Sequence, residues 1–225
     1  MIEQRSKTTN QKRLAAILLA AGQSRRMGQF KPLLPFGDKT VIESCIDYLV
    51  TGGVTDLVVV VGHRANDVRN ALRSTSAKFA LNPIADSEMS ASIASGIGEI
   101  EGSNGAVLIA LVDHPAVTTT VVQSLAGEWR NDSRIVIPTW HGRGGHPVLV
   151  DLGFRDALSH LDSAKGLKGF LDAQRTAVKH LPVDCPFIAR DIDTWDDYTA
   201  LHCDVFGKLP RLVDQRKPDW PHPMD

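Results

Sequence analysis

Residues 15–38 read AAILLAAGQSRRMGQFKPLLPFGD, an apolar run that breaks into a glycine-containing loop. The run over 14–20 is continuously apolar rather than alternating, which is typical of a strand buried on both faces in a parallel sheet covered by helices. The loop that follows carries three positive charges, on Arg25, Arg26 and Lys31. We therefore expect a buried first strand that ends in a local cluster of basic side chains.

Other parts of the chain repeat this pattern of short apolar runs separated by helical spacing. Three further runs are predicted as strands: DLVVVVG (56–62), AVLIALV (106–112) and RIVIP (134–138). Helices are predicted between Thr40 and Gly52, and over 65–74, 90–99, 118–128, 151–172 with a break near Gly166, and 194–203. The alternation of strand and helix predicts an α/β domain with a mostly parallel, doubly wound sheet.

Two helix starts carry a recognisable capping pattern. Thr40 is followed three residues later by Glu43, which together form a capping box in which each side chain bonds the other residue's backbone N–H. Thr194 and Asp197 have the same spacing and mark the start of the last helix.

The two ends of the chain differ in composition from its centre. Residues 1–12 are polar, lack the apolar core of a signal peptide, and are predicted to be a flexible lead-in. One domain is expected over 13–204. The stretch 205–225 contains four prolines and many charges, and it is predicted to be an extended surface tail.

The overall composition narrows the classes of function. The 25 basic and 26 acidic residues nearly balance, so no global field would recruit nucleic acid or an anionic membrane. Three widely separated cysteines, Cys45, Cys185 and Cys203, favour neither a disulfide framework nor a zinc cage, and a cytoplasmic setting is expected. No apolar run reaches the roughly 20 residues of a membrane-spanning helix. An anion site in this chain must therefore be local.

The loop after the first strand fits neither common phosphate-binding motif. Gly22 is followed by Gln23 and Ser24, so G-x-G-x-x-G fails, and no Gly-Lys-Ser/Thr follows as a Walker motif requires. A turn of small residues followed by arginine and lysine nevertheless suits a polyphosphate. A solvated basic loop is the alternative, but the place at the carboxyl end of a buried strand, where open α/β sheets bind ligands, favours a site.

Acidic residues occur at two places that could serve the same site. Asp113 ends the apolar strand 106–112, and a carboxylate there is a natural ligand for Mg²⁺. Alternatively, Asp113 caps the helix that begins near Thr118. Asp193, in the stretch RDIDTWDDY, could complete a metal site, whereas most other acids of that stretch are expected to be capping or surface residues.

Two further stretches offer polar groups but are weaker signals. Ser90 and Ser92 fall at the start of a predicted helix, where they could present hydroxyl and amide groups to an anion or serve structure alone. His146 belongs to the glycine-rich stretch HGRGGHPVLV, which either touches substrate or forms a mobile hairpin.

Together, five stretches resemble one known family. LLAAGQSRRMGQFK, MSASI, VDHP, GHPVL and DIDTWDDY occur in this order over roughly 13–203, and they are similar to motifs of the MobA-like nucleotidyltransferases, especially the molybdenum cofactor cytidylyltransferases. The resemblance implies a GT-A-like, Rossmann-related three-layer sandwich. It also implies an enzyme that joins a nucleoside triphosphate to a phosphorylated acceptor, here a molybdopterin-type cofactor, and releases pyrophosphate.

The resemblance also implies a role for each matching residue. The nucleotide would be bound by Ala20, Ala21, Gly22, Ser24, Arg25, Arg26 and Lys31. The acceptor would be bound by Ser90, Ser92 and His146. Mg²⁺ would be held by Asp113 and Asp193, and the catalytic residues would be Arg26, Lys31 and Asp113. Ala21 stands where guanylyltransferases of the family carry glycine, which implies CTP.

Departures from the family pattern keep alternatives open. His114 replaces the usual glutamine of D-Q-P, and Glu88 replaces a glycine before MSAS, so the acceptor is less well defined than the nucleotide. The alternatives are a transferase that uses GTP or another acceptor, such as a sugar or alcohol phosphate, and a non-catalytic cofactor carrier. A molybdenum hydroxylase or its maturation factor is the partner that the leading interpretation implies.

Overall fold

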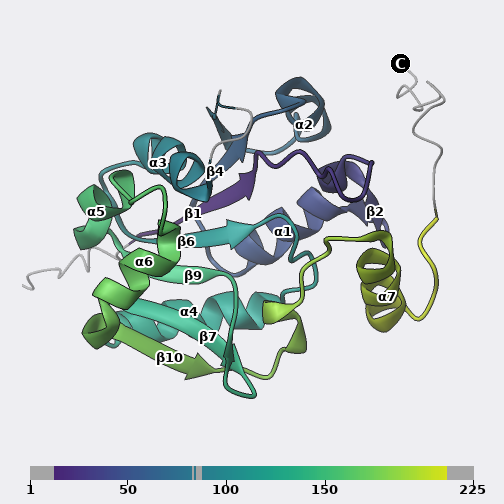
Figure 1. Ribbon diagram of the computed structural model, residues 1–225. Helices are drawn as coiled ribbons and strands as arrows, with labels where there is room; N and C mark the ends of the chain where they lie inside the picture. The colour runs from purple at the N-terminus through teal and green to yellow at the C-terminus, as the bar shows by residue number, and fades with distance from the viewer. Residues whose placement is uncertain (1–12, 83, 85–87, 212–225) are drawn as a thin grey trace, which may run out of the picture.

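A central sheet with helices on both faces forms the body of the protein in the computed structural model, which describes residues 13–82, 84 and 88–211. The strands of this sheet are β1 (Arg13–Ala20), β4 (Asp56–Val61), β5 (Lys78–Leu81), β6 (Asn104–Leu111), β7 (Ile135–Trp140), β8 (Arg143–Gly144), β9 (Val148–Asp151) and β10 (Val178–Pro182). Their order is β10-β7-β9-β6-β1-β4-β5, and β8 pairs with β7. In Figure 1 the sheet runs from β4 near the top to β10 at the bottom.

The sheet is mixed but mostly parallel. β1 pairs in parallel with β4 and β6, β4 with β5, and β7 with β10. β9 runs antiparallel between β6 and β7. The predicted α/β class with a mostly parallel sheet is confirmed.

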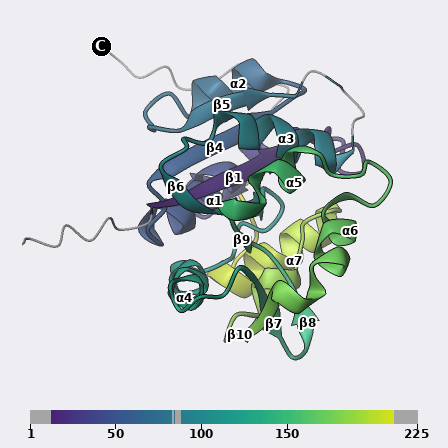
Figure 2. The ribbon, with the colours of Figure 1, turned by 90° about the vertical axis from the view of Figure 1, so that its left-hand side faces the viewer.

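Two helical layers enclose the sheet, and the alternation of side chains along β1 defines them. Leu14, Ala16 and Leu18 face one hydrophobic core, whereas Ala15 and Ile17 face the other. The first core is covered by α1 (Val41–Thr51), α2 (Ala65–Ala71), α4 (Thr119–Arg130) and α7 (Trp195–Phe206). The second is covered by α3 (Met89–Glu99), α5 (Arg155–Ser159) and α6 (Gly166–Ala173). Figure 2 shows α4 and α6 on opposite sides of β7.

Short elements fill the connections between these layers. A hairpin of β2 (Pro35–Phe36) and β3 (Lys39–Thr40) leads into α1. Single 3-10 turns are η1 (Lys31–Leu33), η2 (Leu152–Phe154), η3 (Arg175–Ala177) and η4 (Pro186–Ala189). No helix in the described ranges is long and apolar enough to cross a membrane.

Both predicted capping boxes are present. The backbone N–H of Thr40 donates to Glu43 Oε2 at 2.7 Å, and that of Glu43 donates back to Thr40 Oγ1 at 3.4 Å. At the start of α7, Thr194 N donates to Asp197 Oδ2 at 2.8 Å and Asp197 N to Thr194 Oγ1 at 3.2 Å. Local sequence therefore sets where α1 and α7 begin.

The prediction of one helix over 151–172 is wrong at its start. Asp151 ends β9, and the helical region consists of η2, α5 and α6 with a break over 160–165. The backbone N–H groups of Lys165 and Gly166 both donate to the carbonyl of Asp162, which closes a tight turn before α6. The predicted break near Gly166 is therefore confirmed. The two helices on either side of it, α5 and α6, are shorter than the predicted range.

The domain boundaries proposed from composition stay predictions. Residues 1–12 and the tail from 212 onward lie outside the described residues. α7 continues to Phe206 and ends at Gly207, whose φ of +68° suits glycine, so the helix runs two residues past the predicted boundary at 204.

Candidate active site

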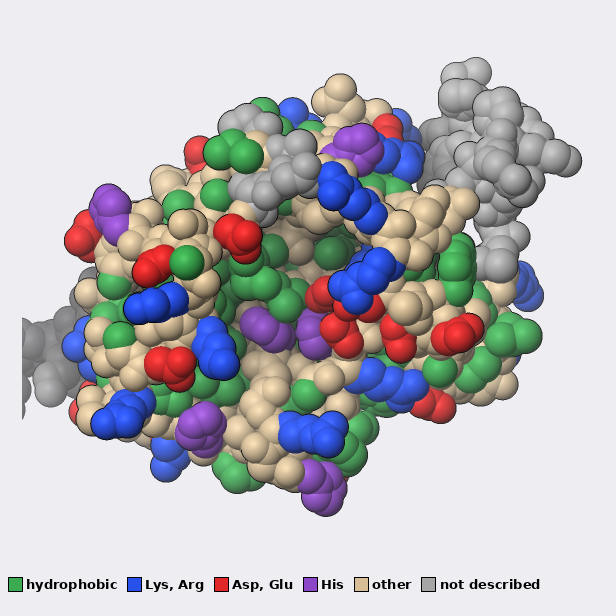
Figure 3. Space-filling view, in the orientation of Figure 1, with side chains coloured by type: hydrophobic (Ala, Val, Ile, Leu, Met, Phe, Trp, Pro, Cys, Tyr) green, Lys and Arg blue, Asp and Glu red, His purple; other side chains and the backbone are tan. Residues whose placement is uncertain are grey.

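The carboxyl ends of four neighbouring strands meet at one edge of the sheet. In the strand register Leu19 lies opposite Leu111, Ala20 opposite Val61, and Val61 opposite Leu81. Because these strands are parallel, the loops that follow them emerge side by side. A cavity of about 270 Å³ lies among these loops. Figure 3 shows a hollow on this face, with acidic and basic side chains crowded at one edge.

The cavity brings together part of the predicted site. Of the residues predicted to bind ligand or metal, those that line it are Ala21, Gly22, Ser24, Lys31, Ser92 and Asp113. Those outside its lining are Ala20, Arg25, Arg26, Ser90, His146 and Asp193. The remaining lining residues are Leu19, Pro32, Asn82, Ile84, Met89, Leu111 and Val112. The charged residues of the lining, Lys31 and Asp113, come from the β1 loop and the end of β6, whereas the side near α3 contributes the uncharged residues Asn82, Ile84, Met89 and Ser92.

The loop after β1 is held in a tight conformation by its own serine. Ser24 has a φ of +53°, and its Oγ accepts a hydrogen bond from the backbone N–H of Lys31 at 3.1 Å. Met27 N donates to the carbonyl of Ser24 at 3.1 Å, which closes a turn. Arg25 is exposed, and its Nε donates to Gln23 Oε1 at 3.0 Å. Ser24 thus orders the loop and places Lys31 at its end.

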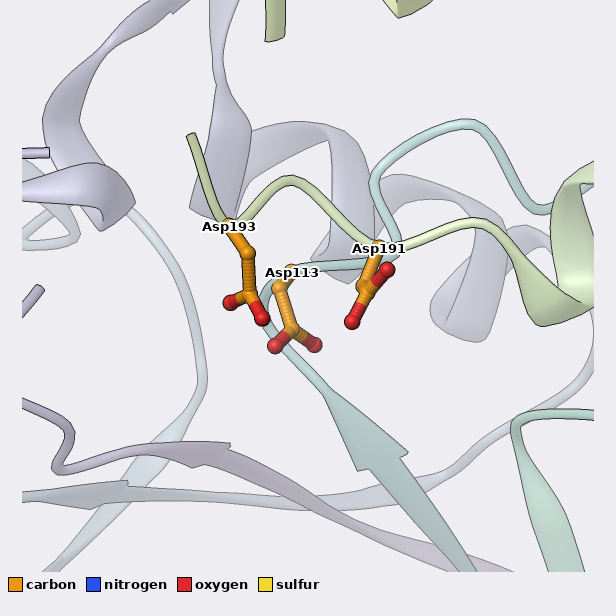
Figure 4. Close-up of side chains that lie close together, drawn as sticks. All are labelled: Asp113, Asp191 and Asp193. Carbon is orange, nitrogen blue, oxygen red and sulfur yellow. The ribbon is translucent and has the colours of Figure 1, made fainter. Parts of the chain in front are cut away.

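Three carboxylates gather beside this loop. Asp113 follows β6, whereas Asp191 and Asp193 come from the segment before α7, and one ligand oxygen from each lies within 4.8 Å of the others. The backbone N–H of Ile192 donates to the carbonyl of Asp113 at 3.1 Å, which fastens the two segments together. Figure 4 shows the three side chains side by side, projecting in the same direction with Asp113 between the other two.

Two basic side chains neutralise much of this negative charge. Arg26 Nη2 lies 2.8 Å from Asp193 Oδ2. Lys31 Nζ lies 3.2 Å from Asp193 Oδ1 and 3.8 Å from Asp113 Oδ2. The Lys31 side chain is only 10% exposed, so water screens its attraction to the carboxylates weakly. The residues predicted as the triphosphate side and the metal side of the site are therefore in direct contact.

The donor set fits a divalent cation. Asp113 Oδ1 is buried and accepts no hydrogen bond from any residue in the described ranges, which is costly unless a cation or another donor occupies the site. Carboxylate oxygens are the ligands that hard divalent ions prefer. Asp113 does not cap the following helix, because Thr118 is the N-cap of α4.

The predicted acceptor residues occupy different surroundings. Ser92 Oγ accepts a hydrogen bond from Asn82 Nδ2 at 2.8 Å beside the cavity, whereas Ser90 is buried in the first turn of α3. His146 Nδ1 lies 3.4 Å from the carbonyl oxygen of Ile109. Glu88 directly precedes α3 and is exposed.

Two histidines adjoin the acidic cluster. The rings of His114 and His146 are 5.4 Å apart between centroids, and His114 Nε2 lies 3.7 Å from Asp113 Oδ1. His114 is 6% exposed, and its Nδ1 is buried without a hydrogen-bond partner in the part of the chain that the structure describes. The departure from the family's glutamine therefore falls directly beside the predicted metal ligand.

His146 should make the stability of the protein depend on pH. Burial, followed by the charge of neighbouring His114, lowers the pKa of His146 from its ordinary 6.5 to about 4. Between these values the unfolded chain binds a proton that the folded chain does not, so stability is full above pH 6.5 and falls as the pH drops toward about 4. We expect the melting temperature of His146→Gln to fall less than that of the wild type over this interval. If the melting temperatures of the two proteins fell equally over this pH interval, this account of His146 would be contradicted.

Sequence reasoning missed Asp191 as a member of the acidic cluster. Asp191 and Asp193 are two residues apart and flank Ile192, which is fully buried. In an extended segment, residues at this spacing point to the same side, so the pattern D-I-D around an apolar residue could have indicated a pair of carboxylates.

The fold and the site define an α/β nucleotidyltransferase domain of GT-A-like architecture, and comparison with known proteins agrees. The chain belongs to the family described by the MobA-like NTP transferase domain, whose model matches residues 16–178. The recognition made from the sequence motifs is thereby confirmed.

Individual relatives resemble the chain over most of its length. It is 28% identical over 209 residues to nicotine blue oxidoreductase of Paenarthrobacter nicotinovorans, covering 89% of this chain and 96% of that protein. It is 25% identical over 186 residues to the molybdenum cofactor cytidylyltransferase of Escherichia coli K12, covering 81% and 92%. The crystal structure of Rv0371c from Mycobacterium tuberculosis H37Rv superposes with a TM-score of 0.76 at 25% identity, covering 84% and 97%. Another structure of that protein is a complex with manganese.

Proposed function

We propose that the protein is a Mg²⁺-dependent cytidylyltransferase that moves CMP from CTP onto the phosphate of molybdenum cofactor and releases pyrophosphate. The observation that carries this proposal is the contact between Lys31 and Arg26 on one side and the carboxylates of Asp113 and Asp193 on the other. A nucleoside triphosphate with its metal ion presents both signs of charge at once. The phosphate oxygens would pair with the side chains of Lys31 and Arg26, and the metal ion would be held by the carboxylates in their place.

The reaction needs no nucleophile from the protein. An oxygen of the acceptor's phosphate attacks the α-phosphorus of CTP, and the bond between that phosphorus and the bridging oxygen breaks to release pyrophosphate. Lys31 and Arg26 stabilise the negative charge that accumulates on the departing phosphates. The bond from Lys31 N to Ser24 Oγ orders the backbone at Lys31 before substrate arrives, so positioning would contribute to the rate.

Metal chemistry would be supplied at the acidic cluster. Asp113 and Asp193 would hold Mg²⁺, with Asp191 close enough to contribute. A bound divalent ion withdraws charge from phosphate oxygens and orients the triphosphate. This role is supported by the buried Oδ1 of Asp113, which has no hydrogen-bond partner among the residues that the structure describes. The manganese complex of the related Rv0371c is consistent with a divalent metal in this fold.

The nucleotide and the acceptor are assigned from the resemblance to the cytidylyltransferases of the family. Ala21 favours CTP by its resemblance to cytidylyltransferases, and Ala20, Gly22 and Arg25 would complete the nucleotide side. Ser90, Ser92 and His146 would bind the acceptor, of which only Ser92 lines the cavity. A molybdenum hydroxylase or its maturation factor would receive the product.

A second candidate function is that of an oxidoreductase. The similarity to nicotine blue oxidoreductase, which extends over 89% of this chain, favours it. The ion pairs of Lys31 and Arg26 with the acidic cluster favour nucleotidyl transfer, because a redox reaction has no triphosphate charge to stabilise.

A thermal-shift panel separates these candidates. We expect CTP with Mg²⁺ to raise the melting temperature, with smaller shifts for GTP, ATP and UTP and for CTP without metal, because a ligand that binds only the folded state stabilises it by mass action. At 100 times the dissociation constant the gain would be about 2.7 kcal/mol.

The panel also includes nicotinamide dinucleotides, and an assay of pyrophosphate release follows it; each other outcome points elsewhere. A shift with GTP alone would contradict the use of Ala21 to assign cytidine. Shifts with nicotinamide dinucleotides but with none of the four triphosphates would favour the redox candidate. Binding of CTP and molybdopterin without release of pyrophosphate would indicate a cofactor carrier rather than an enzyme.

A further inference from the structure

Asp193 lies between two residues that each bond a different segment of the site. On its N-terminal side, Ile192 N donates to the carbonyl of Asp113 at 3.1 Å. On its C-terminal side, the indole Nε1 of Trp195 donates to the carbonyl of Met27 at 3.0 Å, across 168 positions of sequence. The position of Asp193 is therefore fixed from both sides by contacts outside its own segment.

Packing holds the indole of Trp195 in place. Trp195 is the first residue of α7, and its ring lies edge-on to Tyr198 with centroids 5.5 Å apart. Tyr198 is fully buried, and its hydroxyl donates to the carbonyl of Pro35. The indole N–H is the single polar group of the Trp195 side chain, so its bond to Met27 is the directional contact that the residue can make.

The acceptor of this bond belongs to the loop that carries the cations. Met27 directly follows Arg26, its side chain is 4% exposed, and its backbone N–H closes the turn onto Ser24. The carbonyl of Met27 is therefore part of an ordered turn rather than a loose surface group. Through it, the start of α7 is bound to the same turn that presents Arg26 to Asp193 at 2.8 Å.

We propose that Trp195 is a positioning residue that holds Asp193 in reach of both Arg26 and Asp113. Without the bond to Met27, the segment before α7 could move away from the β1 loop while remaining fastened to Asp113 by Ile192. The inference deepens the proposed function, because it rests on the metal site that this function requires. Groups that orient metal ligands typically contribute 10–100-fold to metal affinity.

The test measures the affinity of the full chain for Mn²⁺ by electron paramagnetic resonance, without any substrate. Trp195→Phe keeps an aromatic ring against Tyr198 and removes the N–H donor. We expect it to raise the Mn²⁺ dissociation constant about tenfold. Trp129→Phe is the matched control, since the Trp129 indole also donates at 3.0 Å, to Asp151 Oδ2 at the end of β9. This variant should bind Mn²⁺ as the wild type does, even if both variants lose similar thermal stability.

The outcomes separate this inference from the proposed function. Wild-type affinity in Trp195→Phe, or equal weakening in Trp129→Phe, would overturn the positioning role of Trp195. A wild-type protein that releases no pyrophosphate from any triphosphate, while Trp195→Phe still weakens Mn²⁺ binding, would overturn the proposed function and leave the positioning role standing. A wild-type protein without affinity for Mn²⁺ would overturn both.

Discussion

Replacing Asp113 with alanine is expected to abolish turnover, with a loss of at least about 10³-fold, while the protein stays folded. Asp113 would hold the metal that stabilises charge on the triphosphate, so its loss would remove a transition-state interaction of several kcal/mol, and about 4 kcal/mol corresponds to that factor. The fold should tolerate the change, because the buried oxygen of Asp113 makes no hydrogen bond within the described ranges and its removal relieves repulsion from Asp193. Pyrophosphate release at saturating Mg²⁺, together with a melting curve, measures both effects.

A control for Asp113→Ala should remove an aspartate without touching the cluster. Asp156 serves this purpose, since its side chain is 98% exposed and pairs only with the exposed His160 among the described residues. Asp156→Ala should retain full activity and stability. If Asp113→Ala turned over CTP at a near-normal rate, Asp113 would have no part in the mechanism.

Replacing Lys31 with alanine is expected to lower kcat/KM at least tenfold, about 1.4 kcal/mol in the barrier. The Lys31 ammonium faces two carboxylates in a nearly buried position, where it would stabilise charge on the leaving pyrophosphate. Unlike Asp113→Ala, this variant should still bind Mn²⁺, because all three carboxylates remain. Steady-state kinetics and metal titration of the same preparation distinguish the two variants.

Lys39 provides the comparison for Lys31. Its Nζ pairs with Asp47 Oδ2 at 2.9 Å on the surface, and its side chain is 48% exposed. Lys39→Ala should behave as the wild type, since exposed ion pairs contribute little. An unchanged kcat/KM in Lys31→Ala would show that the β1 loop does not act on the triphosphate.

The central strands could be predicted from the sequence because strands that are buried on both faces consist of continuous apolar runs. β1, β4, β6 and β7 were all recognised, and they form the middle of the sheet together with β9. β5 and β10 lie at the edges, where the half-buried Lys78 and the exposed His180 interrupt any apolar run. β9 was missed because most of its residues belong to the stretch HGRGGHPVLV, whose glycines suggested a turn.

The site was only partly predictable, because its parts come from distant segments. The motif around Arg26 and Lys31 and the end of β6 at Asp113 have local signals, and these pointed to one edge of the sheet. The ion pairs that join Asp193 to the β1 loop depend on how α7 packs, and no pattern within either segment encodes that contact. Asp191 and the indole bond of Trp195 became evident only in three dimensions.

The central claim is that the basic loop and the acidic cluster bind one metal–triphosphate complex. The most direct measurement is a crystal structure with Mn²⁺ and a CTP analogue that cannot release pyrophosphate, in which anomalous scattering locates the metal. We predict Mn²⁺ between the carboxylates of Asp113 and Asp193, with triphosphate oxygens in contact with Lys31 and Arg26. Metal or triphosphate bound elsewhere, with Lys31 and Arg26 still paired to the carboxylates, would contradict the account.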